Sequence, residues 1–267
     1  MIYNILDIKK EGWAPNMKIE MVLNQLVQVF KYTLKQQLEG VYLHGSLAMN
    51  GFHPLKSDID LLVVVNQKLD EPIMTKMIEG LMNLESFLPP RGVEMSIVTT
   101  QTVQHFSYPT PFELHYSNQY REPYLKKGAL CKNGLDPDLA AHIFVTYHRG
   151  KTLYGKPIKQ VIKPIEERYY LESILNDVED ARTHIKENPV YYTLNLCRVL
   201  YYLKEKVVSS KKEAGEWALQ VIPSSYHPLV RYALSHYTGQ NGAVDGWEGI
   251  LMEFTDYMLI EMDNLKR

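Results

Sequence analysis

Cysteine is scarce in this chain, and so are the patterns that it forms at zinc and redox sites. The two cysteines among 267 residues, Cys131 and Cys197, belong to no CxxC pair. The sequence therefore gives no support for a zinc site or a redox motif. Each cysteine has an apolar neighbour, and we expect two free thiols, as is usual in a reducing cytoplasm.

Long apolar runs and a strong excess of either charge are also missing. No stretch approaches the ~18 apolar residues that a membrane helix needs, and no basic start followed by an apolar run indicates a signal peptide. The formal net charge is -2 and the isoelectric point is near 6.5, which argues against a protein that coats nucleic acid. We therefore expect a cytoplasmic protein that binds neither membranes nor nucleic acid.

Strand and helix patterns alternate in the first part of the chain. The spacing of apolar residues predicts helices over 18–39 and 72–86, and short apolar runs predict strands over 41–44, 59–65 and 93–98. The run 59–65 is almost entirely apolar, which is typical of a strand buried on both faces. This alternation predicts an α/β (α+β) layer built on a mixed sheet, and we expect the Tyr- and Pro-rich segment after Thr99 to be irregular.

Strand patterns nearly vanish in the second part of the chain. A helix is predicted over 137–154, and Gly155-Lys156-Pro157 breaks it, so we place a domain boundary there. Beyond the boundary, the pattern predicts helices over 166–186, 190–206, 211–219, 229–237 and 247–266. We therefore expect a first domain of residues 1–157 and an all-helical bundle of residues 158–267.

Asp58 and Asp60 carry the strongest chemical signal, because they stand at the edge of the apolar strand 59–65. Side chains two residues apart on a strand point to the same face. Two carboxylates so close repel each other, and a charge on a buried strand is costly unless it is paired or bound to metal. Mg²⁺ removes both problems, since it prefers oxygen ligands and keeps substrate phosphates in its shell. Both aspartates are therefore candidate metal ligands.

Gly45 and Ser46 stand where the strand 41–44 turns into a helix, and Glu94 lies on another predicted strand. Glycine lets a phosphate approach the backbone, and a helix start offers free N–H groups to an anion. Three carboxylates can hold two metal ions, and Glu94 can also take the proton from an attacking hydroxyl. Alone, each of these features is more often a turn, a solvated loop edge or a surface glutamate. Together, in this order and on strand edges, they indicate a nucleotide site.

Two stretches carry a resemblance to known enzymes. Residues 43–46 (Leu-His-Gly-Ser), followed by 57–63 (Ser-Asp-Ile-Asp-Leu-Leu-Val), resemble the signature of the DNA polymerase β-like nucleotidyltransferase superfamily. Residues 192–198 and 210–218 are similar to the C-terminal helical domain of aminoglycoside adenylyltransferases of the streptomycin/spectinomycin type. The likeness spans most of the chain, and the C-terminal part narrows it to the antibiotic-modifying branch.

The resemblance implies roles for five charged residues. Asp58 and Asp60 would bind Mg²⁺, with two ions in the site, and Glu94 would be the third carboxylate and the catalytic base. Arg198 and Lys211 would reach from the helical domain to the phosphates of ATP, which makes physical sense because cations from a second domain would close the cleft around a triphosphate. From the residues alone, Arg198 could equally belong to a buried ion pair, and Lys211 reads as a solvated lysine at a helix start.

The resemblance further implies transfer of AMP from Mg-ATP to a hydroxyl of an aminoglycoside, with release of pyrophosphate. Gln119 and Asn188 stand where streptomycin-modifying relatives have a tryptophan and an aspartate, which favours a spectinomycin-like acceptor. Glu113 and Glu216 are candidates for acidic groups that face a cationic acceptor, although each is also typical of a surface or capping residue. The histidines form no ligand pattern, and we interpret them as structural or surface residues.

Two alternatives stay open at this point. One is the same chemistry on a different metabolite or another antibiotic class. The other is a nucleotide-binding regulatory module without transferase activity, although the complete set of three carboxylates speaks against it.

Overall fold

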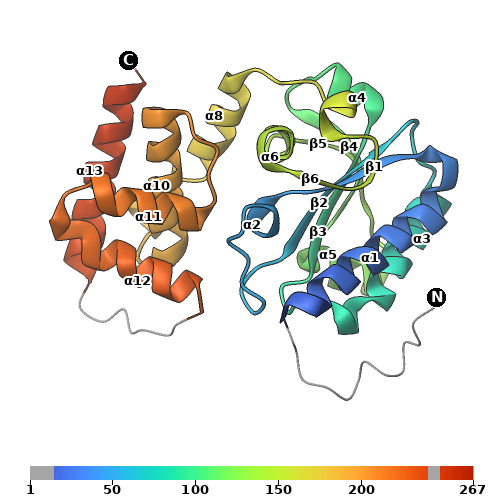
Figure 1. Ribbon diagram of the computed structural model, residues 1–267, viewed down its shortest axis with the longest axis horizontal. Helices are drawn as coiled ribbons and strands as arrows, with labels where there is room; N and C mark the ends of the chain where they lie inside the picture. Colours follow the sequence, from blue (N-terminus) through green and yellow to red (C-terminus); the bar gives the residue numbers. More distant parts are fainter. Residues whose placement is uncertain (1–14, 240–246, 267) are drawn as a thin grey trace.

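The computed structural model describes residues 15–239 and 247–266, and it contains a sheet domain followed by a helical bundle (Figure 1). The strands are β1 (Leu38–Leu43), β2 (Ile59–Val65), β3 (Val93–Thr99), β4 (Thr110–Tyr116), β5 (Cys131–Asp136) and β6 (Lys151–Gly155). They form a 6-stranded sheet in the order β5-β4-β3-β2-β1-β6. The pair β2–β3 is parallel and the other neighbouring pairs are antiparallel, which confirms the predicted mixed sheet.

Helices cover both faces of this sheet (Figure 1). On one face, α1 (Pro15–Leu34) and α3 (Glu71–Asn83) pack against Leu61 and Val63 of β2. On the other, α4 (Thr100–Gln104), α6 (Leu139–Arg149) and α7 (Ile158–Val161) pack against Leu62 and Val64. Successive side chains of a strand point to opposite faces, so β2 is apolar on both sides because both sides are covered.

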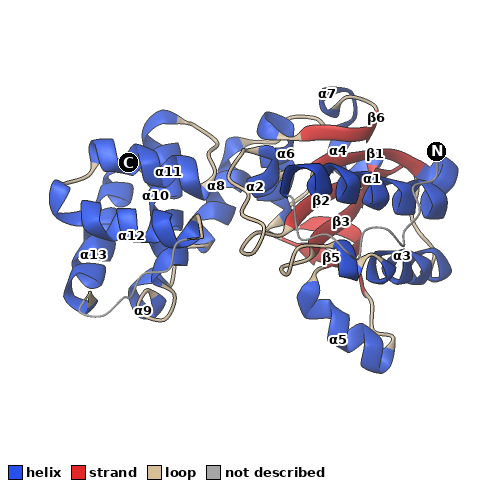
Figure 2. Cartoon of the chain, turned by 60° about the horizontal axis from the view of Figure 1, so that its bottom comes forward, coloured by secondary structure: helices blue, strands red, loops and turns tan. Residues whose placement is uncertain are grey.

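The second part of the described chain is helical, as predicted, and Figure 2 shows every strand in the other half of the molecule. Its helices are α8 (Glu167–Asn176), α9 (Ala181–His184), α10 (Pro189–Glu205), α11 (Lys211–Val221), α12 (His227–Tyr237) and α13 (Glu248–Leu265). The central helix α10 contacts α11, α12 and α13, and Leu196, Cys197 and Leu200 of α10 are fully buried. Phe144 of α6 stacks on Tyr170 of α8 with ring centroids 4.4 Å apart, which joins the bundle to the sheet domain.

Several predicted boundaries are wrong. The helix expected over 18–39 ends at Leu34, because Lys35 has a φ of 50° and a 3-10 turn (Lys35–Gln37) then leads into β1. The segment after Thr99 is not irregular, since it contains α4, β4, α5 (Asn118–Lys127) and β5. The helix expected over 137–154 stops at Arg149, and the chain continues as β6, which pairs with β1 at the edge of the sheet.

The helix expected over 166–186 is divided into α8 and α9. The domain division at residue 157 stays a prediction, and Val161 and Ile162, just beyond it, pack with the sheet residues Tyr42 and Leu62. Within the described ranges, no helix combines the length and the apolar character that a membrane crossing requires.

Candidate active site

Three carboxylates converge at one end of β2 and β3. Asp60 and Glu94 are direct partners in the parallel register of these strands, and Asp58 stands one residue before β2 begins. Alternation along β2 puts Asp58 and Asp60 on the face of Leu62, which is the face that α6 covers. One carboxylate oxygen from each of the three residues lies within 4.8 Å of the other two. The structure therefore brings together the three acidic residues that the sequence singled out.

The electrostatics of Asp60 favour a cation at this place. Burial raises the pKa of Asp60 well above its ordinary value, and the neighbouring Asp58 and Glu94 raise it further, while Lys211 and the Ser46 backbone N–H act in the opposite direction. Three ionised carboxylates this close are stable only with a positive counterpart. Oxygen atoms are the ligands that Mg²⁺ prefers, so the donor set fits this ion.

Gly45 is held in a conformation that suits glycine at the corner between β1 and α2 (Gly45–Ala48). Its φ is 62°, and a Cβ added there would lie 1.9 Å from Oδ2 of Asp60. The absence of a side chain thus leaves room for the Asp60 carboxylate, and the His44 N–H donates to the Asp60 carbonyl at 3.0 Å. Within the part of the chain that the structure describes, Ser46 lines the cleft, and its buried hydroxyl has no hydrogen-bond partner.

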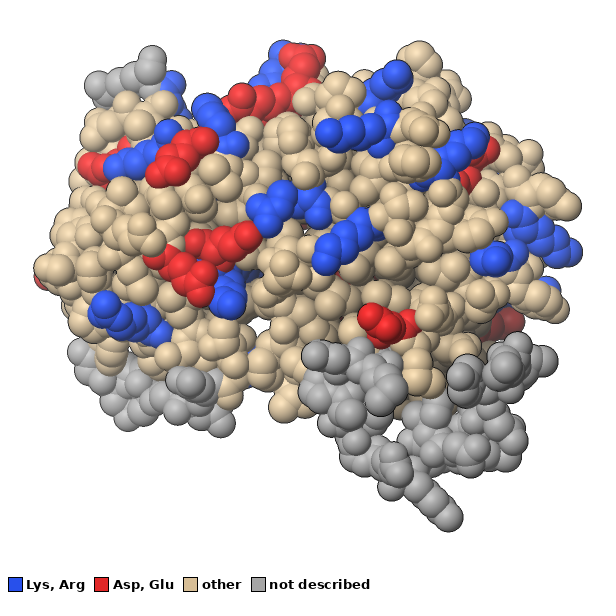
Figure 3. All heavy atoms as spheres, in the orientation of Figure 1, with Lys and Arg blue, Asp and Glu red and all other residues tan. Residues whose placement is uncertain are grey.

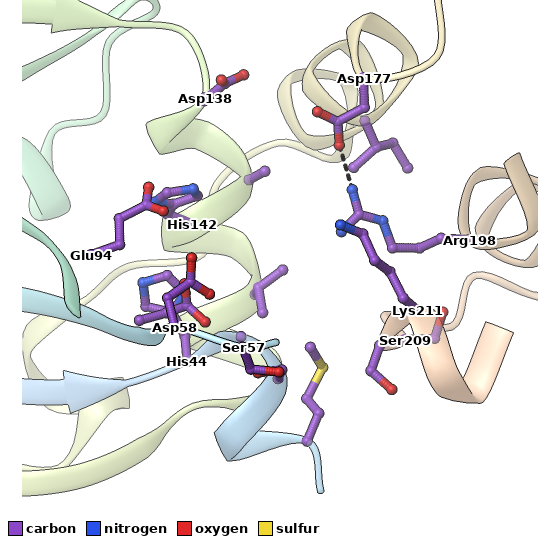
Figure 4. Close-up of a pocket in the computed structure, with 18 of the residues that line it drawn as sticks. His44, Ser57, Asp58, Glu94, Asp138, His142, Asp177, Arg198, Ser209 and Lys211 are labelled. Carbon is purple, nitrogen blue, oxygen red and sulfur yellow. Dashed lines mark hydrogen bonds and ion pairs between the residues drawn. The ribbon is translucent and has the colours of Figure 1, made fainter. Parts of the chain in front are cut away.

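Cations face the carboxylates from the helical bundle (Figure 4). Arg198 of α10 forms an ion pair with Asp177, and Lys211 is the first residue of α11. The Lys211 ammonium lies 4.7 Å from the ring centroid of Tyr191. Burial, followed by the charge of Arg198, lowers the pKa of Lys211 to about 8, while Asp177, Asp58 and Asp60 raise it. Lys211 is therefore within electrostatic reach of the opposite wall.

A cleft of about 360 Å³ lies between the two walls. On the face drawn in Figure 3, basic and acidic side chains are interspersed over both halves of the molecule. All seven predicted site residues line the cleft: Gly45, Ser46, Asp58, Asp60, Glu94, Arg198 and Lys211. A second cavity of about 490 Å³ shares Asp58, Arg91 and Glu94 with the cleft and extends to Asn118 and Gln119. Two ligands can therefore meet at the carboxylates from different sides.

The residues suggested for a cationic acceptor are mostly elsewhere. Glu113 is a buried residue of β4 that accepts a hydrogen bond from the Leu69 N–H at 3.0 Å and lines neither cavity, so its suggested role in the cleft is wrong. Glu216 is exposed on α11, 3.8 Å from Lys212, and it lies outside both cavities, so that suggestion is also wrong. Asn188 precedes α10 and is exposed, whereas Gln119 lines the second cavity.

Sequence reasoning missed several residues of the cleft. His142 of α6 lines it beside Glu94 in Figure 4, and its ring centroid lies 5.0 Å from that of the buried His44. Burial lowers the pKa of His44 well below its ordinary value, with a further contribution from His142. The position of His44 directly before Gly45 is the sequence feature that could have indicated its place in the cleft. Asp138 and Asp177 also line the cleft, and only the packing of α6 and α8 brings them there.

Comparisons with known proteins agree with this arrangement. Residues 23–121 match the nucleotidyltransferase domain family, and residues 160–261 match the family described as aminoglycoside adenylyltransferase, C-terminal domain. A spectinomycin 9-adenylyltransferase from Campylobacter jejuni is 24% identical over 251 residues, which cover 92% of this chain and 96% of the relative. An aminoglycoside (3'') (9) adenylyltransferase from Klebsiella pneumoniae is 28% identical over 253 residues, covering 90% of this chain and 94% of the relative.

A solved structure shows the same fold. It is a spectinomycin adenyltransferase from Enterococcus faecalis, crystallised with ATP and spectinomycin, and it is 21% identical with a TM-score of 0.77. The match covers 91% of this chain and 99% of that one. The chain thus combines a nucleotidyltransferase domain with a domain that matches the C-terminal domain of aminoglycoside adenylyltransferases, and along nearly its whole length it is similar to spectinomycin and aminoglycoside adenylyltransferases.

Proposed function

We propose that this protein transfers AMP from Mg-ATP to a hydroxyl of an aminoglycoside antibiotic and releases pyrophosphate. The observation that carries the proposal is the cleft in which Asp58, Asp60 and Glu94 face Arg198 and Lys211. The relatives are named for the same reaction, and the solved relative was crystallised with ATP and spectinomycin. The proposal places the enzyme in the cytoplasm, where ATP is supplied and where the two free cysteines would stay reduced.

ATP fits the part of the cleft that lies between the Gly45–Ser46 corner and the bundle. The unpartnered Ser46 hydroxyl and the N–H groups at the start of α2 can bind phosphate oxygens. Arg198 and Lys211 add two positive charges from the opposite side, and hydrogen bonds from ionised donors to phosphate are stronger than neutral ones. Because these groups come from both domains, the triphosphate would be held between them.

Asp58, Asp60 and Glu94 would hold magnesium, and three carboxylates of this kind can hold two ions. When bound there, magnesium neutralises charge on the phosphates and makes the attacking hydroxyl more acidic. One Glu94 oxygen can serve as a ligand while the other takes the hydroxyl proton. The acceptor oxygen then forms a bond to the α-phosphorus, the bond from that phosphorus to the bridging oxygen breaks, and pyrophosphate leaves with the electron pair. Arg198 and Lys211 stabilise the charge that develops on pyrophosphate.

The acceptor fits the second cavity, because this cavity shares Asp58 and Glu94 with the cleft. Gln119 stands in its wall and offers no aromatic face on which a guanidinium group could stack. Streptomycin carries such groups and spectinomycin does not. We therefore propose spectinomycin, or an acceptor of similar size, as the substrate rather than streptomycin.

A pyrophosphate-release assay over an acceptor panel tests the proposal, with mass detection of the adenylylated product. Asp58→Asn and Asp60→Asn should abolish transfer in a folded protein, and Glu94→Gln should lower turnover more than it weakens ATP binding. Glu216→Gln is the matched control, because this glutamate is exposed and lies outside both cavities. Full activity of either aspartate variant would contradict the metal assignment, and ATP binding without transfer to any acceptor would favour a regulatory module.

A further inference from the structure

A single arginine of the sheet domain holds the start of α11. Arg149, the last residue of α6, donates one hydrogen bond to the Val208 carbonyl at 2.6 Å and another to Oε1 of Glu213 at 2.8 Å. Helix α6 packs against the sheet through Leu139 and Ile143. Val208 and Glu213 belong to the bundle, so the Arg149 side chain crosses from one domain to the other.

The receiving end of this contact is the connection that leads into α11. Ser210 is the N-cap of α11, and it forms a capping box with Glu213. The Ser210 N–H donates to Oε2 of Glu213 at 2.8 Å, and the Glu213 N–H donates to the Ser210 hydroxyl at 3.2 Å. Glu213 thus binds the cap with one oxygen and Arg149 with the other. Lys211 is the residue that directly follows the cap.

The charges make this arrangement stable. Burial alone would raise the pKa of Glu213, but the Ser210 N–H and Arg149 outweigh it and hold the pKa below its ordinary value. Glu213 therefore stays ionised and can bind the guanidinium. About two-thirds of each side chain is covered, with exposures of 33% for Arg149 and 36% for Glu213, so solvent screens the pair only in part.

We propose that Arg149 is a positioning residue that sets the place of Lys211 opposite the carboxylates, acting through Val208 and Glu213. The inference rests on the proposed function, because it takes Lys211 as a ligand of the ATP phosphates. Lys211 is carried on the first turn of a helix whose start is fixed by Glu213 and whose preceding connection is fixed at Val208. Arginine suits this role, since its planar fork reaches a carbonyl and a carboxylate at once, which the single ammonium of lysine does not.

A double-mutant cycle on Mg-ATP affinity, measured by calorimetry in the full chain without acceptor, tests this inference. Arg149→Met should weaken ATP binding about tenfold, a coupling typical of residues that share one network. The same substitution in a Lys211→Met background should change the affinity by less than about twofold, because the lysine that it positions is then absent. Arg149→Lys keeps the charge but loses the fork, and it should give an intermediate loss.

Two further variants separate positioning from general effects. Glu213→Gln keeps a side chain that can complete the capping box but loses the charge that Arg149 binds, so it should also weaken ATP binding. Arg182→Met is the control, because Arg182 pairs with Asp256 inside the bundle at 3.2 Å and should leave the affinity unchanged. If Arg149→Met does not fold, the Arg149→Lys and Glu213→Gln variants are used in the same cycle.

Each remaining outcome decides against the inference. If Arg149→Met weakens ATP binding equally in the parent protein and in the Lys211→Met background, Arg149 acts through domain packing or long-range charge. Unchanged affinity in Arg149→Met would remove the role altogether. If Lys211→Met binds ATP as tightly as the parent protein, the proposed role of Lys211 fails as well, whereas a failure of acceptor transfer alone leaves these binding results intact.

Discussion

Replacing Gly45 by alanine should disable the carboxylate cluster while leaving the protein folded. Gly45 has a φ of 62°, and an alanine Cβ there would lie 1.9 Å from Oδ2 and 2.5 Å from Cγ of Asp60. Ordinary contacts of a Cβ begin at 3.4 Å, so the carboxylate has to move by about 1.5 Å. A displacement of about 1 Å at a reacting centre can cost ~100-fold in rate, and we expect a loss of at least that size.

The structure provides a matched control in Gly128, at the C-terminal end of α5. Its φ is also 62°, but a Cβ added there would meet nothing within 4 Å. Both alanine variants carry the backbone cost of the left-handed conformation, about 1–2 kcal/mol. Only Gly45→Ala also displaces Asp60, so the difference between the two variants isolates the effect on the site.

The assay combines urea unfolding with pyrophosphate release at saturating ATP. Both variants should lose a similar free energy of unfolding, and Gly128→Ala should keep nearly full turnover. If Gly45→Ala unfolds like Gly128→Ala and retains more than a tenth of the parental turnover, the placement of Asp60 does not limit the reaction, and the reasoning from the 1.9 Å contact is wrong.

Three further predictions concern titration and reactivity. Burial, then Asp58 and Glu94, raise the pKa of Asp60, so magnesium should displace a proton from it and bind more tightly as pH rises. Calorimetric heats of magnesium binding that do not depend on the ionisation enthalpy of the buffer would contradict this. Burial and Arg198 lower the pKa of Lys211 to about 8, so the protonated ammonium is lost as pH rises through 8 and ATP affinity should then fall by up to about tenfold per pH unit. Lys211→Arg should remove this decline because arginine stays charged. If ATP affinity falls with pH equally in the parent protein and in Lys211→Arg, the assignment to Lys211 is refuted. Burial raises the pKa of the Cys197 thiol to about 12. A thiol reagent should therefore label only the partly exposed Cys131 in the native protein, and both cysteines in denaturant. Two labelled thiols in the native state would show that Cys197 is not buried.

The sheet-domain wall of the site could be predicted because its geometry is local. The strand expected over 59–65 is β2 with the same bounds, since its unbroken apolar run reflects cover on both faces. The two-residue spacing of Asp58 and Asp60 then fixes their common face. The distance from Asp60 to Glu94 depends on the register between β2 and β3, which no local pattern encodes. For that step, the family resemblance supplied what periodicity could not.

The remaining elements depend on tertiary packing. Strand β6 is mostly exposed at the edge of the sheet, so it lacks the apolar alternation that marks a strand, and most of its residues fall within the helix predicted over 137–154. Asp177 reaches the cleft only because α8 packs beside α10, where it meets Arg198. Glu113 is of a residue type that is typical of the surface, yet it is buried and accepts a hydrogen bond from the Leu69 N–H, a contact that no local pattern predicts.

The parallel register of β2 with β3 ties the reactive groups to the integrity of the sheet. A slip of β3 by one residue would turn Glu94 toward α1 and α3, among Phe30 and Leu61, and would turn Met95 toward the cleft. The same change would therefore remove the Glu94 carboxylate from the proposed metal site and bury it in an apolar core. Neither strand can therefore gain or lose a residue without losing catalysis and stability together.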